Sequence, residues 1–346
     1  MENKVYDFKL DINWELIHLI NEIDRFDSQW TVIERREYQS LKQLKSIATV
    51  RSVGASNRIE GNKMSDEEID VLLQKIDITT LTDRDSQEVV GYFNTLDMIA
   101  ESFENIAITE SNIKSLHNTL MKYSAKDEWH KGNYKAHNNA VEATFSDGTR
   151  QIIFQTAEAG FATDDAMLRL IDWYNAETEA PSLIKSAVFV YEFLSIHPFQ
   201  DGNGRLSRLL STLLLLRNGY KWIQYVSFEH EIESRKAEYY QALRSCQAGR
   251  PNEDVTVWIL FFLNALRNIQ SQLMIKLEQS GSVSQLSPKE KSILAIIEHY
   301  SGIKSGEIAE KLSIPNPTVK RILSDLQTKG LIEKQGNGRG TSYSVK

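Results

Sequence analysis

The twelve residues from His197 to Arg208, HPFQDGNGRLSR, constrain this chain more than any other stretch of the sequence. They bring an imidazole, a carboxylate, two glycines and two arginines together, directly before an apolar run. That run has the spacing of a helix, with Leu206, Leu209, Leu210, Leu213 and Leu214. A glycine-containing loop that enters a helix exposes unpaired N–H groups at the positive end of the helix dipole. Such a terminus binds anions, so the stretch predicts a phosphate site.

The charged side chains of this stretch suit a nucleotide. Arg205 and Arg208 lie three positions apart, on one face of the first helical turn, where guanidinium groups can bind phosphate bidentately. Cations at a helix N-terminus oppose the dipole, at about 0.3–1 kcal/mol each, unless an anion compensates them. Asp201 is suited to hold Mg²⁺ against phosphate oxygens. His197 is suited to take a hydroxyl proton near neutral pH.

The same string resembles the signature of the Fic family, HxFx(D/E)GNGRxxR, and agrees with it at every specified position. The resemblance implies that His197 is the catalytic base, Asp201 the metal ligand and Phe199 a core anchor for the loop. It also implies an ATP site made of Gly202, Asn203, Gly204, Arg205, Leu206, Ser207 and Arg208. Fic proteins mostly transfer AMP from ATP to a protein hydroxyl, so ATP and Mg²⁺ are the expected cofactors.

A second segment, SNRIEGN from Ser56 to Asn62, ends a predicted helix. By itself Glu60-Gly61 indicates an ordinary helix end with glycine at C′. Beside the Fic-like stretch, Ser56, Glu60 and Gly61 resemble the family's inhibitory motif, (S/T)xxxE(G/N). The resemblance implies that Glu60 pairs with Arg208 and takes the place of a terminal phosphate. ATP would then bind in a pose that does not allow transfer, so we expect autoinhibition by Glu60.

The segment from Gly132 to Phe154 contains two β-prone runs around Ser146-Asp147-Gly148-Thr149, which predicts a β-hairpin. Fic proteins resemble it in having a hairpin flap at this place. The resemblance implies a strand edge that pairs with an extended target segment, formed by Asn139, Ala140, Val141 and Glu142. A hairpin that only covers the core is the alternative. Lys135 stands where arginine is commoner in the family, which leaves the details of the flap open.

Other side chains with aromatic, imidazole or thiol groups have two interpretations each. Tyr239 and Tyr240 resemble the family's stretch that closes over the adenine, yet paired tyrosines on a helix are equally typical of a core. His117 is more typical of a satisfied core or surface histidine than of a ligand. Cys246, the single cysteine, is more typical of packing than of a nucleophile.

A separate small domain follows a Ser-, Gly- and Gln-rich segment at 279–286. Three helices are indicated, around Ile293 and Ile297, after Ser305 as a cap, and after Pro317 as a start. Two short strands flank GNGRG at 336–340, and this order resembles that of winged-helix regulators.

The charge of this small domain differs from that of the rest. From Val283 onward ten Lys and Arg stand against six Asp and Glu, a balance of +4 within a chain of net charge −7. The asymmetry favours a DNA surface, with Thr318, Lys320, Arg321 and Arg339 as candidate contacts. Winged helices also serve as protein-binding or dimer modules, so a homodimer is another candidate assembly.

Composition limits the class of protein. A pI near 5.6 argues against a chain that as a whole binds nucleic acid or an anionic membrane. One cysteine permits no internal disulfide and no cysteine-based zinc site, which is typical of a reducing compartment. The N-terminal residues lack the pattern of a secretory signal, so we expect a cytoplasmic protein. The apolar runs fall short of the roughly 20 residues of a membrane helix, so no membrane partner is expected.

We therefore predict a mainly α fold with three parts. These are an N-terminal helical region with the inhibitory helix (1–107), a Fic-fold helical core with a β-hairpin flap (108–278), and a linker with a winged helix (279–346). The predicted function is a protein adenylyltransferase that modifies a Tyr, Thr or Ser hydroxyl of a target protein and of itself. Two alternatives stay open: removal of AMP with Glu60 positioning a water, and a DNA-bound regulator with a silent Fic core. The presence of His197 and Asp201 argues against the silent core.

Overall fold

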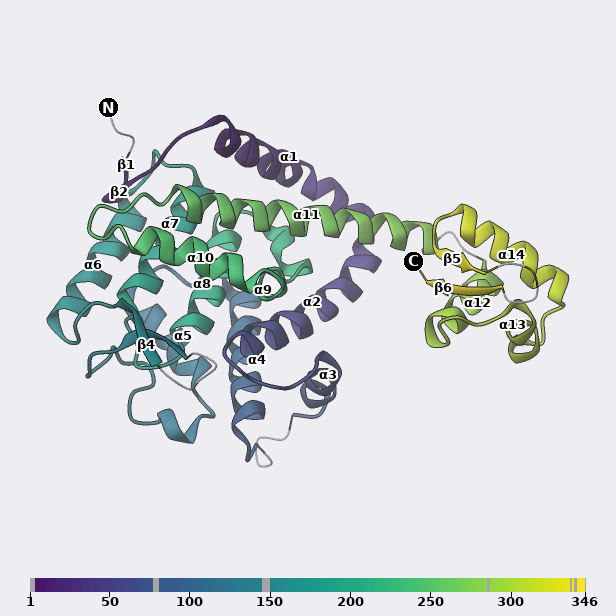
Figure 1. The fold of residues 1–346 in the computed structure, drawn as a ribbon, viewed down its shortest axis with the longest axis horizontal. Helices are drawn as coiled ribbons and strands as arrows, with labels where there is room; N and C mark the ends of the chain where they lie inside the picture. The colour runs from purple at the N-terminus through teal and green to yellow at the C-terminus, as the bar shows by residue number, and fades with distance from the viewer. Residues whose placement is uncertain are drawn as a thin grey trace. The chain divides into compact units, whose positions relative to one another are not determined.

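Helices dominate the chain, which confirms the prediction of a mainly α fold. The computed structural model describes residues 4–76, 81–144, 150–284, 287–336, 338 and 341–345. Within these residues it contains 14 α-helices and three two-stranded antiparallel sheets (Figure 1). The chain divides into two compact units. Unit 1 comprises Met1–Arg36 and Leu41–Ser271, and unit 2 comprises Glu37–Ser40 and Gln272–Lys346.

Unit 1 is built from eleven helices, of which α2 begins and α11 ends in the residues of unit 2. They are α1 (Trp14–Arg36), α2 (Tyr38–Ile59), α3 (Asp66–Gln74), α4 (Arg84–Ser102), α5 (Glu110–Leu120), α6 (Phe161–Ala176), α7 (Ser182–Ile196), α8 (Asn203–Arg217), α9 (Phe228–Ser234), α10 (Lys236–Gln247) and α11 (Thr256–Ser284). Two 3₁₀ helices, η2 (Ala125–Asp127) and η3 (Lys221–Tyr225), lie between them. α11 passes through most of the segment predicted as a linker, because no proline interrupts it before Pro288.

The core of unit 1 is organised around α7 and α8. Every residue of α7 from Ser186 to Ile196 is buried, and α8 is buried from Arg205 to Leu216. A helix that is buried on all sides must be covered by its neighbours, and α8 packs against α7, α4 and α5. Each fully buried leucine stabilises this arrangement by about 1.5–3 kcal/mol. The loop between α7 and α8 is therefore anchored at both ends in the core.

α4 and α5 cross closely beside α8. A Cβ atom at Gly91 would collide with the backbone oxygen of Leu120, so only glycine permits this approach. α5 buries Ile113 and Leu116 on the face that meets the core. The crossing gives the α7–α8 loop a rigid neighbour.

The N-terminal residues and α11 lie along one side of unit 1 (Figure 1). α1 lies alongside α11, where Gln270 Nε2 donates to Ile23 O over 3.2 Å (Figure 1). A strand pair that the sequence analysis did not anticipate, β1 (Lys4–Val5) with β2 (Phe8–Lys9), precedes α1. Lys9 N donates to Glu253 O over 2.9 Å, which attaches this pair to the residues before α11.

α2 ends as the sequence predicts. Its last residue is Ile59, and Gly61 has φ 102°, the left-handed conformation of a C′ glycine. Ser56 and Asn57, in the last turn, are fully buried. This turn therefore faces the interior of unit 1.

The predicted hairpin is present as β3 (Ala140–Thr144) paired antiparallel with β4 (Arg150–Gln155). Ala140 pairs with Gln155, and the register shifts between Val141 and Glu142. The predicted turn at 146–149 lies outside the described residues. β4 is the strand that contacts α10.

Unit 2 contains the order of elements predicted for a winged helix. α12 (Pro288–His299), α13 (Ser305–Leu312) and α14 (Asn316–Thr328) precede β5 (Ile332–Gln335) and β6 (Ser342–Val345). The cap of α13 is Lys304, one residue before the predicted Ser305, since Lys304 N donates to Glu307. Residues 337, 339 and 340 of the predicted wing lie outside the described part. The apolar core is formed by Ile293, Ile297, Ile303, Ile308, Val319, Ile322, Leu323, Leu326, Leu331 and Ile332.

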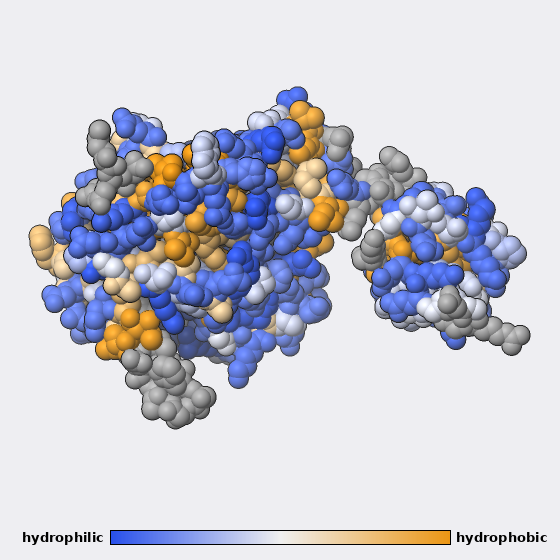
Figure 2. All heavy atoms as spheres, turned by 45° about the horizontal axis from the view of Figure 1, so that its top comes forward, coloured by the Kyte–Doolittle hydropathy of each residue, from blue (hydrophilic) through white to orange (hydrophobic). Residues whose placement is uncertain are grey.

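The face drawn in Figure 2 is mainly hydrophilic, with apolar residues in small patches. Trp14 and Phe161 are the most exposed large apolar side chains among the described residues, at 85% and 83%. None of the helices in the described residues has the length and apolarity needed to cross a membrane.

Candidate active site

The loop between α7 and α8 has the backbone of an anion site. His197 ends α7 with φ 54°, and Gly202 precedes α8 with φ 79°. The N–H of Leu206 donates to Gly202 O over 2.9 Å, the first hydrogen bond within α8. The amides of 203–205 precede it, in the turn where a helix offers no internal acceptors. These amides are the donors that the predicted phosphate site requires.

Several side chains of the predicted ATP site hold the loop itself. Phe199 N donates to Asn203 Oδ1 over 2.9 Å, and Asn203 Nδ2 donates to Phe199 O over 2.7 Å. Ser207 Oγ donates to Gly204 O over 2.7 Å, and Leu206 is buried in the core. Phe199 is also fully buried, in agreement with its predicted place as a core anchor. These side chains are therefore occupied in holding the loop, and the backbone amides of 203–205 are left as the donors of the predicted phosphate site.

His197 lies half-buried at the end of α7, with Nδ1 3.4 Å from Leu194 O. Because a carbonyl oxygen only accepts, this contact places the proton on Nδ1 and leaves Nε2 as an acceptor. Burial lowers the pKa of His197 to about 4. The ring is therefore neutral at physiological pH, which is the state a general base needs.

Arg205 is held by carboxylates from two elements. Its Nη1 is 3.3 Å from Glu88 Oε1 of α4, and its Nη2 is 3.7 Å from Asp201 Oδ1. Glu88 is buried and also accepts from Arg84 Nε over 2.7 Å. No sequence motif marks Glu88, and only the packing of α4 against α8 brings it here. The guanidinium lies beside these two carboxylates, while its Nε and Nη1 atoms are buried without a hydrogen-bond partner.

Asp201 lies at the start of the anion loop with 37% of its side chain exposed. Burial acts to raise its pKa, but Arg205 and the Gly202 N–H outweigh burial and hold the pKa below its usual value. The described residues contain no cluster of three or more His, Cys, Asp or Glu side chains that could hold a metal. Mg²⁺ commonly uses one or two carboxylates with substrate phosphates and water. A single ionised, partly exposed carboxylate beside an anion site fits that donor set.

The predicted ion pair between Glu60 and Arg208 is present. Arg208 Nη2 donates to Glu60 Oε1 over 2.7 Å, while Nε donates to Ser56 Oγ over 2.8 Å. Arg208 is 2% exposed and Glu60 35% exposed. Burial acts against both charges, yet their mutual attraction outweighs it. The pKa of Glu60 is lowered and the pKa of Arg208 is raised.

The Glu60 carboxylate lies against the first turn of α8. A Cβ atom at Gly204 would collide with Glu60 Oε1 and lie 3.4 Å from Arg208 Nη1. Only glycine leaves room for the carboxylate at this position. An anionic group of the chain itself is therefore in contact with the predicted phosphate site.

Contacts outside the motif attach the end of α2 to α9 and α10. Arg58 donates to both carboxylate oxygens of Glu233, over 2.7 Å and 3.0 Å, and to Asp66 Oδ1 over 2.9 Å. Lys236 Nζ donates to Ile59 O over 2.7 Å, at the carbonyl end of the helix. These bonds determine where Glu60 is presented, and no sequence pattern marked them.

Lys135 connects the base of the flap with the loop. Its Nζ donates to Asn139 Oδ1 over 2.8 Å, to Thr156 Oγ1 over 2.9 Å and to Ile196 O over 3.0 Å. Asn139 Nδ2 in turn donates to Phe199 O over 2.9 Å. Burial lowers the pKa of Lys135 to about 8. A lysine can thus serve at the position where arginine is commoner in the family.

The two tyrosines of α10 have different environments. Tyr239 is 3% exposed and packs edge-on against Trp258 and Phe261, so it belongs to the core. Tyr240 lines an open hollow of about 820 Å³, with Arg244 over its ring at 5.3 Å. Of the pair, only Tyr240 offers a face on which an adenine could stack.

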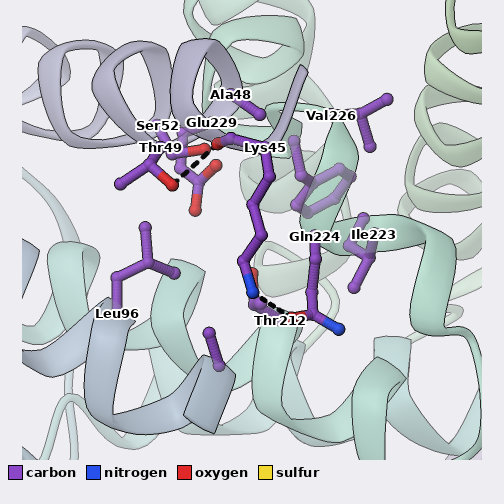
Figure 3. Close-up of a pocket in the computed structure, with 12 residues that line it drawn as sticks. Lys45, Ala48, Thr49, Ser52, Leu96, Thr212, Ile223, Gln224, Val226 and Glu229 are labelled. Atoms are coloured by element: carbon purple, nitrogen blue, oxygen red, sulfur yellow. Dashed lines mark hydrogen bonds between the residues drawn. The ribbon is translucent and has the colours of Figure 1, made fainter. Parts of the chain in front are cut away.

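A small cavity of about 30 Å³ adjoins α2, α4, α8 and α9, and none of the predicted site residues lines it (Figure 3). Lys45 extends along it and donates to Gln224 Oε1 over 3.0 Å (Figure 3). Glu229 lies at its wall and accepts from Tyr92 OH over 2.9 Å. Its volume is on the order of one water molecule, so it cannot be a nucleotide site.

Two family models match the chain. Residues 107–215 match the Fic/DOC family, and residues 286–338 match the MarR family. The first segment contains the hairpin and the whole loop from His197 to Arg208. Fold and site thus define a helical Fic-type domain with a glycine-containing loop at the N-terminus of α8.

Relatives and solved structures agree with this class. A Fido domain-containing protein of Dictyostelium discoideum is 30% identical over 132 residues, which are 37% of this chain and 86% of that protein. The protein named protein adenylyltransferase Fic from Drosophila virilis is 29% identical over 165 residues, 43% of this chain. A Fic family protein from Desulfovibrio desulfuricans G20 has a TM-score of 0.65 with 97% of both chains covered, at 24% identity, which is a likeness of fold.

The chain therefore belongs to the Fic/DOC family. Its match spans 32% of the length of the Drosophila protein. Activity, substrates and partners accordingly follow as proposals.

Proposed function

We propose that this chain is a protein adenylyltransferase, which transfers AMP from ATP to a Tyr, Thr or Ser hydroxyl of a target protein and of itself. The observation that carries the proposal is one short loop that has His197 at the end of α7 and leads to Asp201 and Arg205 at the start of α8, where these two form an ion pair. The names of relatives from Drosophila virilis and Caenorhabditis elegans, which are called protein adenylyltransferases, support it.

The proposed reaction is a substitution at the α-phosphorus of ATP. The target hydroxyl oxygen attacks this phosphorus, and the bond from phosphorus to the oxygen of the β-phosphate breaks, releasing pyrophosphate. His197 Nε2 takes the hydroxyl proton, an effect typically worth about 10²–10⁴-fold in rate. The amides of 203–205 and the buried guanidinium of Arg205 would stabilise the charge that develops on the phosphate oxygens.

Further residues would bind the nucleotide and the target. Asp201 would hold Mg²⁺, which neutralises phosphate charge when bound. Tyr240 would stack on the adenine at the hollow of α10. The edge of β3 at residues 139–142 would pair with an extended target segment through backbone hydrogen bonds, so that its hydroxyl lies near His197.

The Glu60–Arg208 pair supports an inhibited resting form. Because Glu60 touches the first turn of α8, the terminal phosphates of ATP would have to shift away from Arg208. A charge-assisted bond of this type is worth about 1.5–3 kcal/mol, enough to hold about 90% or more of the molecules closed. Inhibition would be strong and reversible, since the alignment of the α-phosphate with the hydroxyl is lost while binding remains.

Incubation of the full chain with α-labelled ATP and Mg²⁺ tests the proposal. Glu60→Gly should raise self-labelling about 10-fold or more over the unaltered chain. The double variant Glu60→Gly with His197→Ala should not label, because release of Glu60 does not replace the base. Equal labelling with and without His197 would overturn the assignment. If Glu60→Gly instead left AMP on a premodified target, Glu60 would be a catalytic residue of AMP removal.

We also propose that unit 2 binds DNA, on the evidence of the MarR match and the exposed cations of α14. Lys320 and Arg321 lie on the second helix of the helix-turn-helix, the one that enters the major groove in this motif. The full chain should retard duplex DNA at low salt, and each cation changed to alanine should lower the salt slope by about one. Lys289→Ala on α12 is the matched control. Absence of retardation at low salt would assign unit 2 to protein binding.

The compartment proposed is a reducing one such as the cytoplasm. This rests on Cys246 alone, which is a free and buried thiol. Burial raises its pKa, so the thiol is protonated and unreactive.

A further inference from the structure

His117 of α5 lies outside the motif, yet its ring contacts the active-site loop. Its Nε2 is 3.0 Å from Asp201 O, and Gly132 N donates to its Nδ1 over 2.9 Å. The ring stacks on Phe199 with centroids 3.8 Å apart and planes 7° apart. The side chain is fully buried. It is the satisfied core histidine that the sequence indicated, but its partners belong to the loop and to the segment before the flap.

The hydrogen bonds determine the tautomer. A backbone N–H only donates and a carbonyl oxygen only accepts, so the proton of His117 is on Nε2 and the lone pair is on Nδ1. Both ring nitrogens are therefore engaged. The loop also lies tightly against this ring, since a Cβ at Gly202 would be 3.3 Å from His117 Nε2 and 3.2 Å from Met121 Sδ.

The position of Asp201 O affects both the candidate Mg²⁺ ligand and the backbone amides at the start of α8. The Asp201 side chain is the candidate Mg²⁺ ligand, and the next residue, Gly202, is the cap of α8. A shift of this carbonyl would move the carboxylate and the first-turn amides together. α5 cannot follow such a shift easily, because Gly91 of α4 crosses it in close contact. A site is most precise when rigid elements support its residues in this way.

We propose that His117 is a positioning residue for nucleotide binding, which holds the Asp201 carbonyl and through it the carboxylate and the anion loop. The inference rests on the proposed adenylyl transfer and names a residue that supports the same site. His117 does not touch the nucleotide. Its effect acts through Asp201, and its bond to Gly132 connects the loop with the segment that leads to the flap.

Two amide variants separate the two hydrogen bonds. Asn carries an oxygen near the place of the histidine Nδ1, so His117→Asn keeps an acceptor for Gly132 and loses the donor to Asp201. Gln carries an NH₂ group near the place of Nε2, so His117→Gln keeps the donor to Asp201. Both lose the stack on Phe199 equally. A purely structural role would affect the two variants alike, whereas positioning would distinguish them.

The experiment uses the full chain with Glu60→Gly, so that inhibition does not mask transfer. His117→Asn should raise the KM for ATP and the Mg²⁺ concentration for half-maximal labelling about 3- to 10-fold, the worth of one hydrogen bond. His117→Gln should stay within about 2-fold of the parent. Hydrogen exchange of the amides at 199–206, without nucleotide, should be faster in the Asn variant only.

Two further variants keep the inference testable if an amide variant folds poorly. His117→Phe retains a ring on Phe199 and loses both hydrogen bonds, so it should resemble the Asn variant. His130→Phe removes a buried neighbour whose Nε2 contacts Asp127 at 3.0 Å, and it should change neither KM nor loop exchange. Equal behaviour of Asn and Gln, or parental behaviour of Phe, would overturn the inference. If the parent did not label while the exchange contrast persisted, the proposed function would fail and the positioning role would stand.

Discussion

The arginines of the anion site and Arg321 of α14 carry the same group in opposite surroundings. Arg208 is 2% exposed and donates hydrogen bonds to Ser56 and Glu60, at 2.7–3.0 Å. Arg321 is 73% exposed, and its nearest carboxylate partner, Asp325, is 3.8 Å away. An exposed pair of that kind is worth about 0–1 kcal/mol and is screened by salt.

The difference teaches what each surface can recognise. A buried guanidinium is fixed in direction, so it selects a ligand by the geometry of its oxygens. An exposed one contributes mainly charge, so it attracts a polyanion over a distance without fixing its orientation. We therefore expect substitutions that keep the charge to harm the first region and to spare the second.

Removal of one carboxylate from each region should give the largest contrast. The Gly202 N–H donates to Asp201 Oδ1 over 2.6 Å. Asp201→Asn keeps an oxygen that can accept this bond, but it loses the charge that would hold Mg²⁺. With Glu60→Gly as background, labelling should fall by about 100-fold or more and no longer respond to Mg²⁺. Asp325→Asn should leave labelling unchanged. Persistence of full labelling in excess EDTA would remove the metal from the proposal.

Exchange of arginine for lysine tests geometry at constant charge. Arg208→Lys, again with Glu60→Gly, should lower labelling about 10- to 100-fold, because an ammonium cannot reproduce the fork of a buried guanidinium. Arg321→Lys should change DNA retardation less than about 2-fold. Similar losses for both variants would show that the two regions do not differ in the way described.

The half-buried ring of His197 predicts a pH effect on the stability of unit 1. Its pKa is about 4 in the folded state, below the usual value of about 6.5. The unfolded chain binds the extra proton between these values, so stability falls as pH drops from about 6.5 to 4. At pH 5 the loss from this residue is about 2 kcal/mol, and His197→Gln should avoid it.

Tryptophan fluorescence is the measurement for this effect. All six tryptophans lie at or before Trp258, so the signal reports on unit 1 and not on unit 2. Unfolding curves of the unaltered chain and of the His197→Gln variant, measured at pH 7.5 and at pH 5, give the difference in free energy of unfolding between the two proteins at each pH. A difference that stays the same at both pH values would mean that folding does not shift the pKa of the His197 ring.

The contacts that hold the end of α2 should have the smallest effect. Glu233→Gln weakens the half-buried pair with Arg58, whose atoms are 2.7 Å apart and which lies outside the phosphate site. Opening of α2 should become easier, and labelling should rise about 2- to 10-fold, as for one charge-assisted bond. The same change in a Glu60→Gly background should add nothing. An equal rise in both backgrounds would mean that Glu233 acts on transfer and not on inhibition.

Much of the site was predictable because its parts are close in the sequence. The loop from His197 to Arg208 is a local structure, and local backbone preferences with helical spacing suffice to place it. The Glu60–Arg208 pair, 148 positions apart, was predicted only through the resemblance to the family. The hairpin and the order of the winged helix followed from turn residues and periodicity.

Other contributors were not predictable, since they depend on how helices pack. Glu88 and His117 lie in ordinary amphipathic helices, and nothing in their neighbours marks them. Tyr239 and Tyr240 are adjacent in sequence, yet one is in the core and the other on the surface. Helical spacing alone could not tell the buried tyrosine from the exposed one. That difference depends on how α11 packs against α10, which the sequence does not show.

The sequence by itself determined the chemistry available to this protein: a histidine, a carboxylate and two arginines around a helix N-terminus, with a glutamate to oppose them. The tertiary structure alone decided which of these groups are fixed, and by what. Glu88 pairs with Arg205, His117 contacts the loop at Asp201 O, and Arg58 with Glu233 connects the last turn of α2 to α9. The reason is physical, because a local motif sets which groups lie side by side along the chain. Burial and long-range hydrogen bonds between helices set their direction, their charge state and their freedom to move.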